Sequence, residues 1–379
     1  MVRSKLPDTG TTIFAVMSKM ADEYNAINLS RGFPDFHCDE ELISLVAEFM
    51  HKGFNQYAPI EGIIELREVI SDLVHKNYSF QYDPEKEILI TAGATQAIYT
   101  AISALVREED EIIIFEPAYD CYVPAIEMNG GIPIFISMKK PDYKIDWDEV
   151  QKMVNPKTKL IIVNTPHNPS GSILNAQDME KLKKIVSGTN ILILSDEVYE
   201  NIIFDGYEHQ SVARFPQLAE RSVIVSSFGK SLHVTGWRMG YCLAPQEIMK
   251  EIRKVHQYLA YTVNTPMQYA IAEYIKRKNY DLSLRQFYQE KRDYFSRLIN
   301  FSRFKIIPSA GTYFQLLDYS SITDEKDMVF AEILTKEHGV ASVPMSVFYK
   351  DKYDAKVLRF CFAKKKETLE RAAERLMKI

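Results

Sequence analysis

Residues 160–196 read LIIVNTPHNPSGSILNAQDMEKLKKIVSGTNILILSD, and this stretch contains the repeating unit that predicts the fold. Its two apolar runs, LIIVN (160–164) and ILILS (191–195), are short and rich in β-branched residues, which is typical of strands buried on both faces. Between them, AQDMEKLKKIV (176–186) has a helical pattern. A strand, a helix and another strand in this order indicate a parallel sheet covered by helices.

Similar apolar runs lie on both sides of this unit: EILIT (87–91), EIIIF (111–115), IPIFI (132–136), SVIVS (222–226) and GYCLA (240–244). We therefore expect an α/β fold with a central, mainly parallel sheet of seven strands sandwiched by helices. After about residue 268 the pattern changes to one long helical stretch and then to short strands and helices, which predicts a smaller α+β domain. The expected division is an N-terminal segment (1–40) that joins the small domain, a large domain (41–285) and a small C-terminal domain (286–379).

Composition narrows the class of protein. The chain has 379 residues, too many for one small core, and its net charge of -5 provides no basic field for nucleic acid. It contains no run of about 18 apolar residues that would predict a membrane span, and its first residues lack the apolar core of a secretory signal. The cysteines, Cys38, Cys121, Cys242 and Cys361, show no CxxC spacing and suggest reduced thiols rather than disulfides or a metal site. A cytoplasmic protein without nucleic-acid or membrane partners is expected.

Ligands of such sheets bind beyond the carboxyl ends of the strands, so the residues there are the candidates for a site. TAGAT (91–95) leads into a helix whose N-terminus, capped by Thr95, could hold a phosphate. Tyr119 could lie flat on a planar ligand, and the stiff loop around Asn168 could present that side chain as a hydrogen-bond donor. Each also has an ordinary interpretation, as a βα turn, a core aromatic residue and turn chemistry respectively.

Two charged residues at strand ends are more informative. Asp196 emerges from an apolar strand and needs a cationic partner, which could be a protonated ring nitrogen of a cofactor or a distant side chain of the protein. Lys230 follows another strand, and Arg238 lies eight positions further on, where it could hold a phosphate and lower the pKa of the lysine. Alternatively, Lys230 is a solvated loop charge. Ser227 and Lys230 also match an SxxK motif, but the SDN and KTG partners of that motif are absent from the sequence.

Taken together, these strand-end residues meet the requirements of one cofactor. Pyridoxal phosphate needs a lysine for a Schiff base, a carboxylate on its pyridine nitrogen and a site for its phosphate. The sequence provides an anion site, a ring stacker, a hydroxyl donor, a carboxylate, a lysine and an arginine at successive strand ends, where the fold gathers them into one crevice.

The motifs NLSRGFPDF, NQYAP, TAGATQA, EPAYDCY, NTPHNPSG, SDEVYE, SSFGKSLHVTGWRMGYC and VLRFCFAK occur in that order over nearly the whole chain. With them, the chain resembles the class I aminotransferases of the aspartate aminotransferase fold, fold type I among pyridoxal-phosphate enzymes. The resemblance is greatest to the branch of the kynurenine aminotransferases (glutamine transaminase K) and the bacterial methionine aminotransferases. These motifs are very specific for fold and reaction and much less so for the substrate.

The resemblance implies a role for each candidate residue. Lys230 bonds to the cofactor and later moves the substrate proton, Asp196 pairs with the ring nitrogen, and Tyr119 stacks on the ring. Asn168 and Tyr199 bind the cofactor hydroxyl, while the phosphate is held by the Gly93 turn with Ala94, Thr95, Ser227 and Arg238, and by Tyr57 of a second subunit in a homodimer. Arg359, helped by Gly32 and Asn168, binds the substrate carboxylate, although a structural salt bridge of Arg359 is the alternative.

The substrate is less clearly indicated. By resemblance, Phe14 and Tyr261, the latter across the dimer, line the side-chain pocket, and residues 256–266 contain no arginine for a second carboxylate. Methionine or an aromatic or glutamine-like amino acid is the expected donor and a 2-oxo acid the acceptor, in a ping-pong reaction. The alternatives are a kynurenine aminotransferase with β-lyase activity toward cysteine S-conjugates, and a DNA-binding regulator with an aminotransferase-like domain. The regulator is disfavoured because the family motifs begin within the first few dozen residues.

Overall fold

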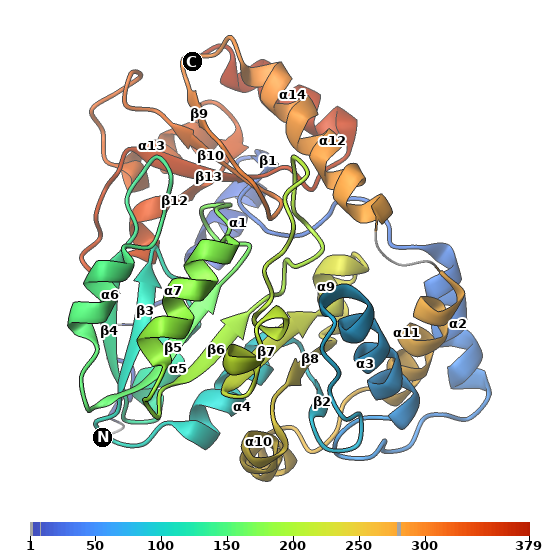
Figure 1. Cartoon of the computed structure of the whole chain (residues 1–379). Coiled ribbons are helices and arrows are strands. Elements are labelled where there is room, and N and C mark those ends of the chain that lie inside the picture. Colours follow the sequence, from blue (N-terminus) through green and yellow to red (C-terminus); the bar gives the residue numbers. More distant parts are fainter. Residues whose placement is uncertain (1–2, 8, 279–281) are drawn as a thin grey trace.

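A seven-stranded sheet forms the centre of the structure, a computed structural model that describes residues 3–7, 9–278 and 282–379 (Figure 1). Its strands, in spatial order, are β2 (Ile88–Thr91), β8 (Gly240–Leu243), β7 (Ser222–Ser227), β6 (Leu192–Asp196), β5 (Thr158–Asn164), β3 (Glu111–Glu116) and β4 (Ile132–Ser137). All neighbouring pairs from β7 to β4 are parallel, whereas β8 is antiparallel to both β2 and β7. The expected α/β fold with a mainly parallel sheet is therefore confirmed, and each predicted strand lies within two residues of an observed one.

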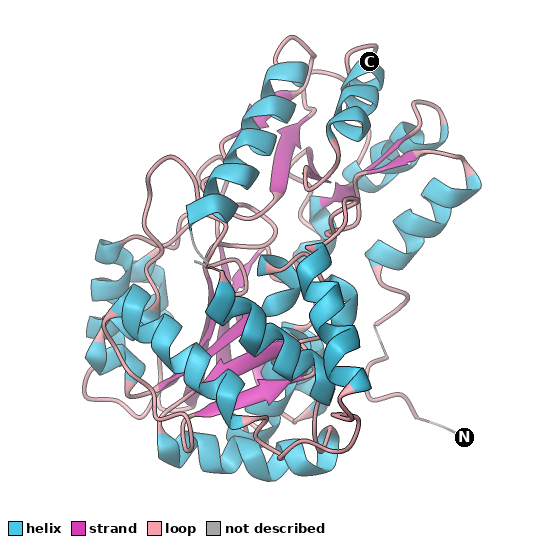
Figure 2. Ribbon diagram, turned by 90° about the vertical axis from the view of Figure 1, so that its right-hand side faces the viewer, coloured by secondary structure: helices cyan, strands magenta, loops and turns pink. Residues whose placement is uncertain are grey.

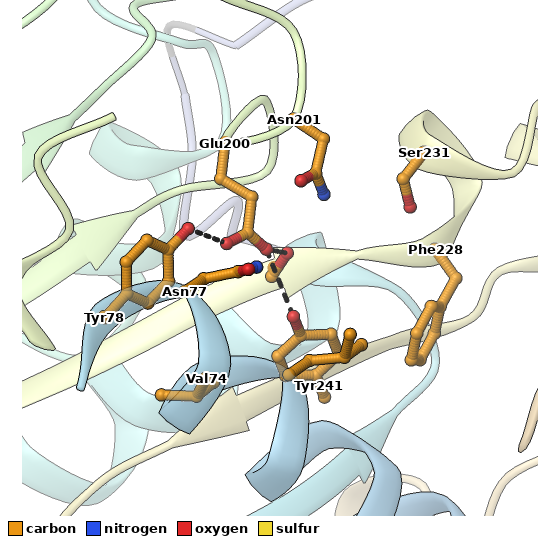
Figure 3. A pocket seen from close by; sticks show the side chains of 10 residues that line it. Val74, Asn77, Tyr78, Glu200, Asn201, Phe228, Ser231 and Tyr241 are labelled. Atoms are coloured by element: carbon orange, nitrogen blue, oxygen red, sulfur yellow. Dashed lines mark hydrogen bonds between the residues drawn. The ribbon is translucent and has the colours of Figure 1, made fainter. Parts of the chain in front are cut away.

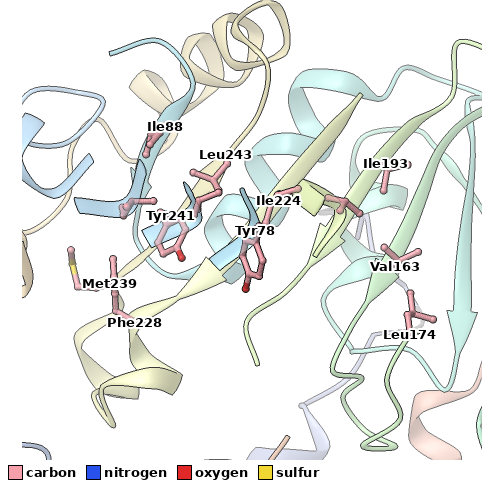
Figure 4. Packing of buried hydrophobic residues seen from close by; sticks show 14 of the residues in the cluster. Tyr78, Ile88, Val163, Leu174, Ile193, Ile224, Phe228, Met239, Tyr241 and Leu243 are labelled. Carbon is pink, nitrogen blue, oxygen red and sulfur yellow. The ribbon is translucent and has the colours of Figure 1, made fainter. Parts of the chain in front are cut away.

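Helices cover both faces of the sheet, which explains why its central strands are apolar at most positions. In β7, Val223 and Val225 pack into one cluster and Ile224 into the cluster on the opposite face. The first cluster is completed by helices α4 (Ala94–Leu105), α5 (Tyr122–Met128) and α10 (Gln246–Leu259). Part of the second appears in Figure 4, where Ile224, Leu243 and Tyr241 lie among neighbours from other strands.

The second cluster is completed by α2 (Glu40–His51), α3 (Ile64–Tyr78), α6 (Trp147–Met153), α7 (Ala176–Val186), α8 (Pro216–Ala219) and α11 (Thr265–Arg277). Helix α7 begins where the sequence predicts, because the Asn175 side chain caps it and the Asp178 carboxylate accepts a hydrogen bond from the Asn175 backbone N–H. Figure 2 shows helices on both sides of the sheet. Burial on both faces leaves only the strand ends open to ligands.

A smaller sheet lies beside the large one, at the top of Figures 1 and 2. It has the order β12 (Val343–Pro344), β13 (Val357–Cys361), β10 (Phe314–Asp318) and β9 (Lys305–Ile307), with antiparallel pairing throughout. Its neighbours are α12 (Leu282–Ile299), α13 (Asp327–Lys336) and α14 (Lys366–Leu376). The long helical stretch expected after residue 268 is thus two helices, α11 and α12.

The N-terminal segment lies against this smaller sheet. Strand β1 (Ile27–Asn28) pairs in parallel with β11 (Val340–Ala341), and α1 (Ile13–Glu23) contributes Met17 to the same apolar cluster. The remaining short elements are α9 (Phe228–Ser231), η1 (Val212–Arg214), η2 (Thr235–Trp237) and η3 (Met345–Phe348). Along the described part of the chain, no helix is long and apolar enough to cross a membrane.

Candidate active site

Asp196 is the last residue of β6, and only 3% of it is exposed. Its carboxylate accepts a hydrogen bond from the Tyr122 hydroxyl at 2.6 Å and one from the Val198 backbone at 3.3 Å. Burial raises the pKa of Asp196 to about 6, although these hydrogen bonds and the nearby Lys230 lower it. Burial makes the charged form of this carboxylate unfavourable, so the carboxylate is suited to pair with a cationic group of a ligand.

Lys230 lies in α9, the single helical turn that follows β7. Strand β7 is the neighbour of β6, the strand that ends at Asp196. Its amine donates a hydrogen bond to the Tyr313 hydroxyl at 3.0 Å. The residue as a whole is only partly buried, but desolvation of its amine, with repulsion from Arg238 and Arg359, lowers the pKa to about 8, while Cys361 and Asp196 act in the opposite direction. More of this amine is therefore unprotonated, and nucleophilic, near neutral pH than in an ordinary lysine.

Three strand ends meet near Lys230 and form a candidate anion site. Thr91 of β2 and Ser227 of β7 both stand opposite Gly240 of β8. Gly93 has φ +82°, and a Cβ there would come within 2.7 Å of a terminal guanidinium nitrogen of Arg238. The sequence-predicted phosphate residues thus come together at the N-terminus of α4, which begins at Ala94 and Thr95, and Thr95 is exposed.

Arg359 lies in the middle of β13 with 1% of its surface exposed. One guanidinium nitrogen donates to the Asn168 side-chain oxygen at 2.6 Å, and the guanidinium carbon lies 3.8 Å from the centroid of the Phe314 ring. Its Nε has no hydrogen-bond partner among the described residues, and none of their carboxylates forms an ion pair with it. The structural salt bridge considered from the sequence is therefore not seen, and a buried guanidinium with free capacity suits a ligand carboxylate.

The remaining predicted residues divide into two groups. Asn168 and Tyr199 are buried, and Tyr119 is partly buried. The ring centroids of Phe14 and Phe348 are 6.2 Å apart, and both rings lie near Arg359. Tyr57 and Tyr261 pack edge to face with each other at 5.3 Å and are 80% and 48% exposed. No contact joins these two tyrosines to Lys230 or Asp196 within the described part of the chain.

The pattern of the family described as "Aminotransferase class I and II" matches residues 24–376. The chain belongs to this family. It is 48% identical to a methionine aminotransferase of Escherichia coli K12, over 100% of this chain and 98% of that protein, and 34% identical to a kynurenine–oxoglutarate transaminase of Dictyostelium discoideum, over 98% and 94%. A crystal structure of Escherichia coli YbdL, for which a methionine aminotransferase function was identified, superposes with a TM-score of 0.98 at 48% identity and covers 100% of both chains.

Pyridoxal phosphate is the cofactor of class I and II aminotransferases, and the residues of this aminotransferase fit it. The turn at Gly93 and the exposed guanidinium of Arg238 provide positive charge and free N–H groups for a phosphate. The buried Asp196, with its raised pKa, matches a protonated ring nitrogen, and Lys230 provides the amine.

Several residues of the aminotransferase site were not assigned a role from the sequence. Asn164, at the end of β5, donates to the Asp196 carbonyl at 2.8 Å, and its side-chain oxygen accepts the Asn168 N–H at 2.8 Å. Tyr122, in the EPAYDCY motif, binds Asp196. Asn164 ends a strand and Tyr122 lies in a family motif, so both were visible in the sequence, but Asp196 is 32 and 74 residues away from them.

A second buried carboxylate, that of Glu200, forms hydrogen bonds near the same strand ends. Glu200 accepts hydrogen bonds from the hydroxyls of Tyr78 at 2.5 Å, Ser226 at 2.8 Å and Tyr241 at 3.1 Å, in the pocket drawn in Figure 3. It follows Tyr199, and Ser226 precedes Ser227. Glu200 therefore connects the loop after β6 to the end of β7, three residues before Lys230.

Replacing Tyr122 by phenylalanine should destabilise the cofactor-free aminotransferase more at pH 8 than at pH 4.5. The pKa of Asp196 in the folded chain, about 6, exceeds the ordinary value of 3.8, so the charge of Asp196 reduces stability as pH rises from about 4 to above 6. Loss of the Tyr122 hydrogen bond raises this pKa further, and the expected cost at pH 8 is about 1.5–3 kcal/mol. Urea unfolding at the two pH values measures it.

The matched control is Tyr319→Phe, which removes a buried hydroxyl that donates to the neutral Glu325 carbonyl at 3.0 Å. Its effect on the free energy of unfolding should be the same at both pH values. An equally pH-independent effect of Tyr122→Phe would show that the hydroxyl does not stabilise the charge of Asp196.

Proposed function

We propose that this aminotransferase binds pyridoxal phosphate through Lys230 and transfers the amino group of methionine, or of an aromatic or glutamine-like amino acid, to a 2-oxo acid. The observation that carries the proposal is that Asp196 and Arg359, from different sheets, both lie near the amine of Lys230, which follows β7. This chemistry requires three groups: an amine with a lowered pKa, a buried carboxylate, and a buried guanidinium that has no carboxylate partner among the described residues.

When bound, pyridoxal phosphate supplies an electron sink that makes the α-hydrogen of an amino acid acidic. Lys230 provides the amine that holds the cofactor and, once displaced by the substrate amine, is the base that takes this proton. Asp196 keeps the ring nitrogen protonated, and Tyr119 covers the ring. Asn168 and Tyr199 bind the ring hydroxyl.

The β2–α4 turn binds the phosphate. The residues that hold it are Gly93, Ala94 and Thr95 of this turn, together with Ser227 and Arg238. Three features support this assignment: the free N–H groups at the start of α4, the guanidinium beside Gly93, and the alignment of Ser227 with Gly240. The amino group leaves the first substrate before the 2-oxo acid binds at the same place, which makes the kinetics ping-pong.

The substrate carboxylate binds Arg359 in a two-pronged pair, beside Asn168 and the Gly32 backbone. Support comes from the free Nε of Arg359 and its bond to Asn168. The rings of Phe14, Phe314 and Phe348 lie 5.1, 3.8 and 5.3 Å from the guanidinium carbon, so the walls around the carboxylate are aromatic.

Methionine is the donor that we favour. Its flexible thioether suits an aromatic wall through sulfur–aromatic contacts, and the chain is similar to the Escherichia coli methionine aminotransferase over its full length. The similarity to a kynurenine–oxoglutarate transaminase supports the second candidate, a kynurenine-type enzyme with β-lyase activity toward cysteine S-conjugates. Its products, pyruvate and ammonia, distinguish it from a transaminase.

We also propose a homodimer in which Tyr57 reaches the phosphate and Tyr261 the substrate pocket of the second subunit. The exposure of both rings, together with that of Tyr258 at 88%, supports a surface that a second copy covers. The division into residues 1–40, 41–285 and 286–379 is proposed as well, supported by the pairing of β1 with β11 and by the separate apolar cluster around the smaller sheet.

The decisive experiment is an absorption spectrum of the protein with pyridoxal phosphate, recorded before and after addition of L-methionine. The visible band of the bound cofactor should move to shorter wavelength with methionine and return with a 2-oxo acid, because the amino group is first stored and then released. A band that responds to other amino acids but not to methionine would refute the donor, and no visible band would refute the proposed function.

A further inference from the structure

Tyr313 places a phenolic hydroxyl directly on the amine of Lys230. The residue immediately precedes β10 in the smaller sheet, and none of its surface is exposed. Its oxygen accepts a hydrogen bond from the Lys230 amine at 3.0 Å and donates to the Gly32 carbonyl at 2.5 Å. Three segments distant in sequence therefore meet at one oxygen atom.

The direction of these two hydrogen bonds matters for the chemistry of the amine. A carbonyl oxygen can only accept, so the hydroxyl proton of Tyr313 is committed to Gly32. Toward Lys230, the oxygen can then act only as an acceptor, and the amine must donate one of its N–H groups. A neutral amine bound in this way keeps its lone pair free, and that lone pair is what takes a proton or attacks a carbonyl carbon.

The ring of Tyr313 is held in place by close packing. The Tyr199 ring stands edge to face with it at 5.1 Å, and the Phe314 ring does so at 4.9 Å. A Cβ on Gly32 would lie 2.7 Å from Phe314 and 3.4 Å from the Tyr313 ring, so glycine is needed for the carbonyl to come this close. The oxygen is thus a fixed point for the flexible lysine side chain.

We propose that Tyr313 is a catalytic residue that holds the free amine of Lys230 in position, with its lone pair available, through a hydroxyl anchored on the Gly32 carbonyl. This inference rests on the proposed role of Lys230 and extends it. Because Gly32 also belongs to the proposed carboxylate site, the same oxygen links the position of the lysine to the segment that receives the substrate.

The first test uses the cofactor-free protein and the variant Tyr313→Phe, which removes only the hydroxyl. Carbamylation of Lys230 by cyanate, followed by mass spectrometry across pH, gives the pH midpoint of its amine. Loss of an acceptor disfavours the charged amine, so the midpoint should fall by about 0.5 to 1 pH unit. The other titratable and charged groups that face this amine are not substituted in the variant: Asp196, Tyr199, Arg238, Arg359 and Cys361.

The second test uses the cofactor-loaded protein in a single turnover with L-methionine. Tyr313→Phe should retain the visible band and its affinity for methionine, while the half-reaction slows roughly tenfold or more because the amine is no longer oriented. The kinetic isotope effect with α-deuterated methionine should rise, since proton transfer becomes more fully rate-limiting. A defect in packing alone would not raise it.

Tyr82→Phe is the matched control, because Tyr82 is 1% exposed and its hydroxyl has no hydrogen-bond partner among the described residues. It should leave the midpoint and the isotope effect unchanged. If Tyr313→Phe does not fold, 3,5-difluorotyrosine at position 313 keeps the ring and weakens the oxygen as an acceptor, with the same expected shifts. A visible band in the wild type with no shift in either variant would overturn this inference alone, whereas no band in the wild type would overturn the proposed function and this inference with it.

Discussion

Replacing Lys230 by alanine is expected to lower the rate of transamination by at least roughly 10²- to 10⁴-fold, the usual contribution of a positioned base. The variant loses both the covalent hold on the cofactor and the base for the α-proton, because the other proton-accepting groups that face the Lys230 amine among the described residues are the Asp196 carboxylate, the Cys361 thiol, whose pKa burial raises, and phenols. Burial raises the pKa of Tyr199 and Tyr313 above the ordinary value, so these hydroxyls stay protonated. Single-turnover rates and mass spectrometry after borohydride reduction measure the two losses.

Lys140→Ala is the control for the lysine. Lys140 binds Asp318 at 2.9 Å and the Ala355 carbonyl at 2.7 Å, away from the proposed site, so its removal should leave the rate unchanged. Added methylamine should restore part of the rate of Lys230→Ala, because a free amine can enter the space left by the side chain and act as the base. Full activity of Lys230→Ala without added amine would refute the assignment of this lysine.

Replacing Asp196 by asparagine should reduce the turnover rate by roughly 10²- to 10⁴-fold while the cofactor still binds. Breaking one partner of a buried ion pair typically costs about 3–5 kcal/mol, which corresponds to such a factor in rate. Asparagine has the same shape and can still accept the Tyr122 hydroxyl, but it cannot hold a proton on the ring nitrogen. Pre-steady-state kinetics with L-methionine, together with a cofactor titration, separate rate from binding.

The same substitution should stabilise the cofactor-free protein at pH 8. The pKa of Asp196 rises from the ordinary value of 3.8 to about 6 on folding, so its stability contribution is present below about pH 4 and lost as pH rises through 6. The charge therefore destabilises the folded chain at pH 8 by about 3 kcal/mol, and asparagine removes this effect. Urea unfolding at pH 8 should give a higher midpoint for the variant.

Asp318→Asn provides a control with the opposite sign. Burial acts to raise the pKa of Asp318, but hydrogen bonds from Ser320 and Lys140 outweigh it and hold the pKa below the ordinary value. This carboxylate therefore contributes stability above its unfolded pKa, and asparagine should lower the unfolding midpoint at pH 8 without affecting turnover. A lower midpoint for Asp196→Asn would contradict the view that Asp196 is held at a cost for its cofactor.

The sheet and the strand-end residues could be predicted because they depend on local patterns. LIIVN, AQDMEKLKKIV and ILILS each carry their own strand or helix signal, and parallel strands joined by helices must place their carboxyl ends on one edge. Asp196 ends such a strand, and Asn168 and Lys230 come within four residues of the end of another, so their convergence followed from the order of elements. The one long helical stretch after residue 268 was wrong in detail, since α11 and α12 are separate helices.

The contacts that tune these residues depend on the tertiary structure. The sequence by itself determined the α/β sheet, the family and the residues at the strand ends, because short-range periodicity and motif order encode them. The bond of Tyr122 to Asp196, the burial of Arg359 without a carboxylate partner and the meeting of Tyr313 with Lys230 and Gly32 were decided only by packing. Tyr313 is 83 residues from Lys230 and 281 from Gly32, and no local pattern specifies which side chains two sheets bring together at such separations.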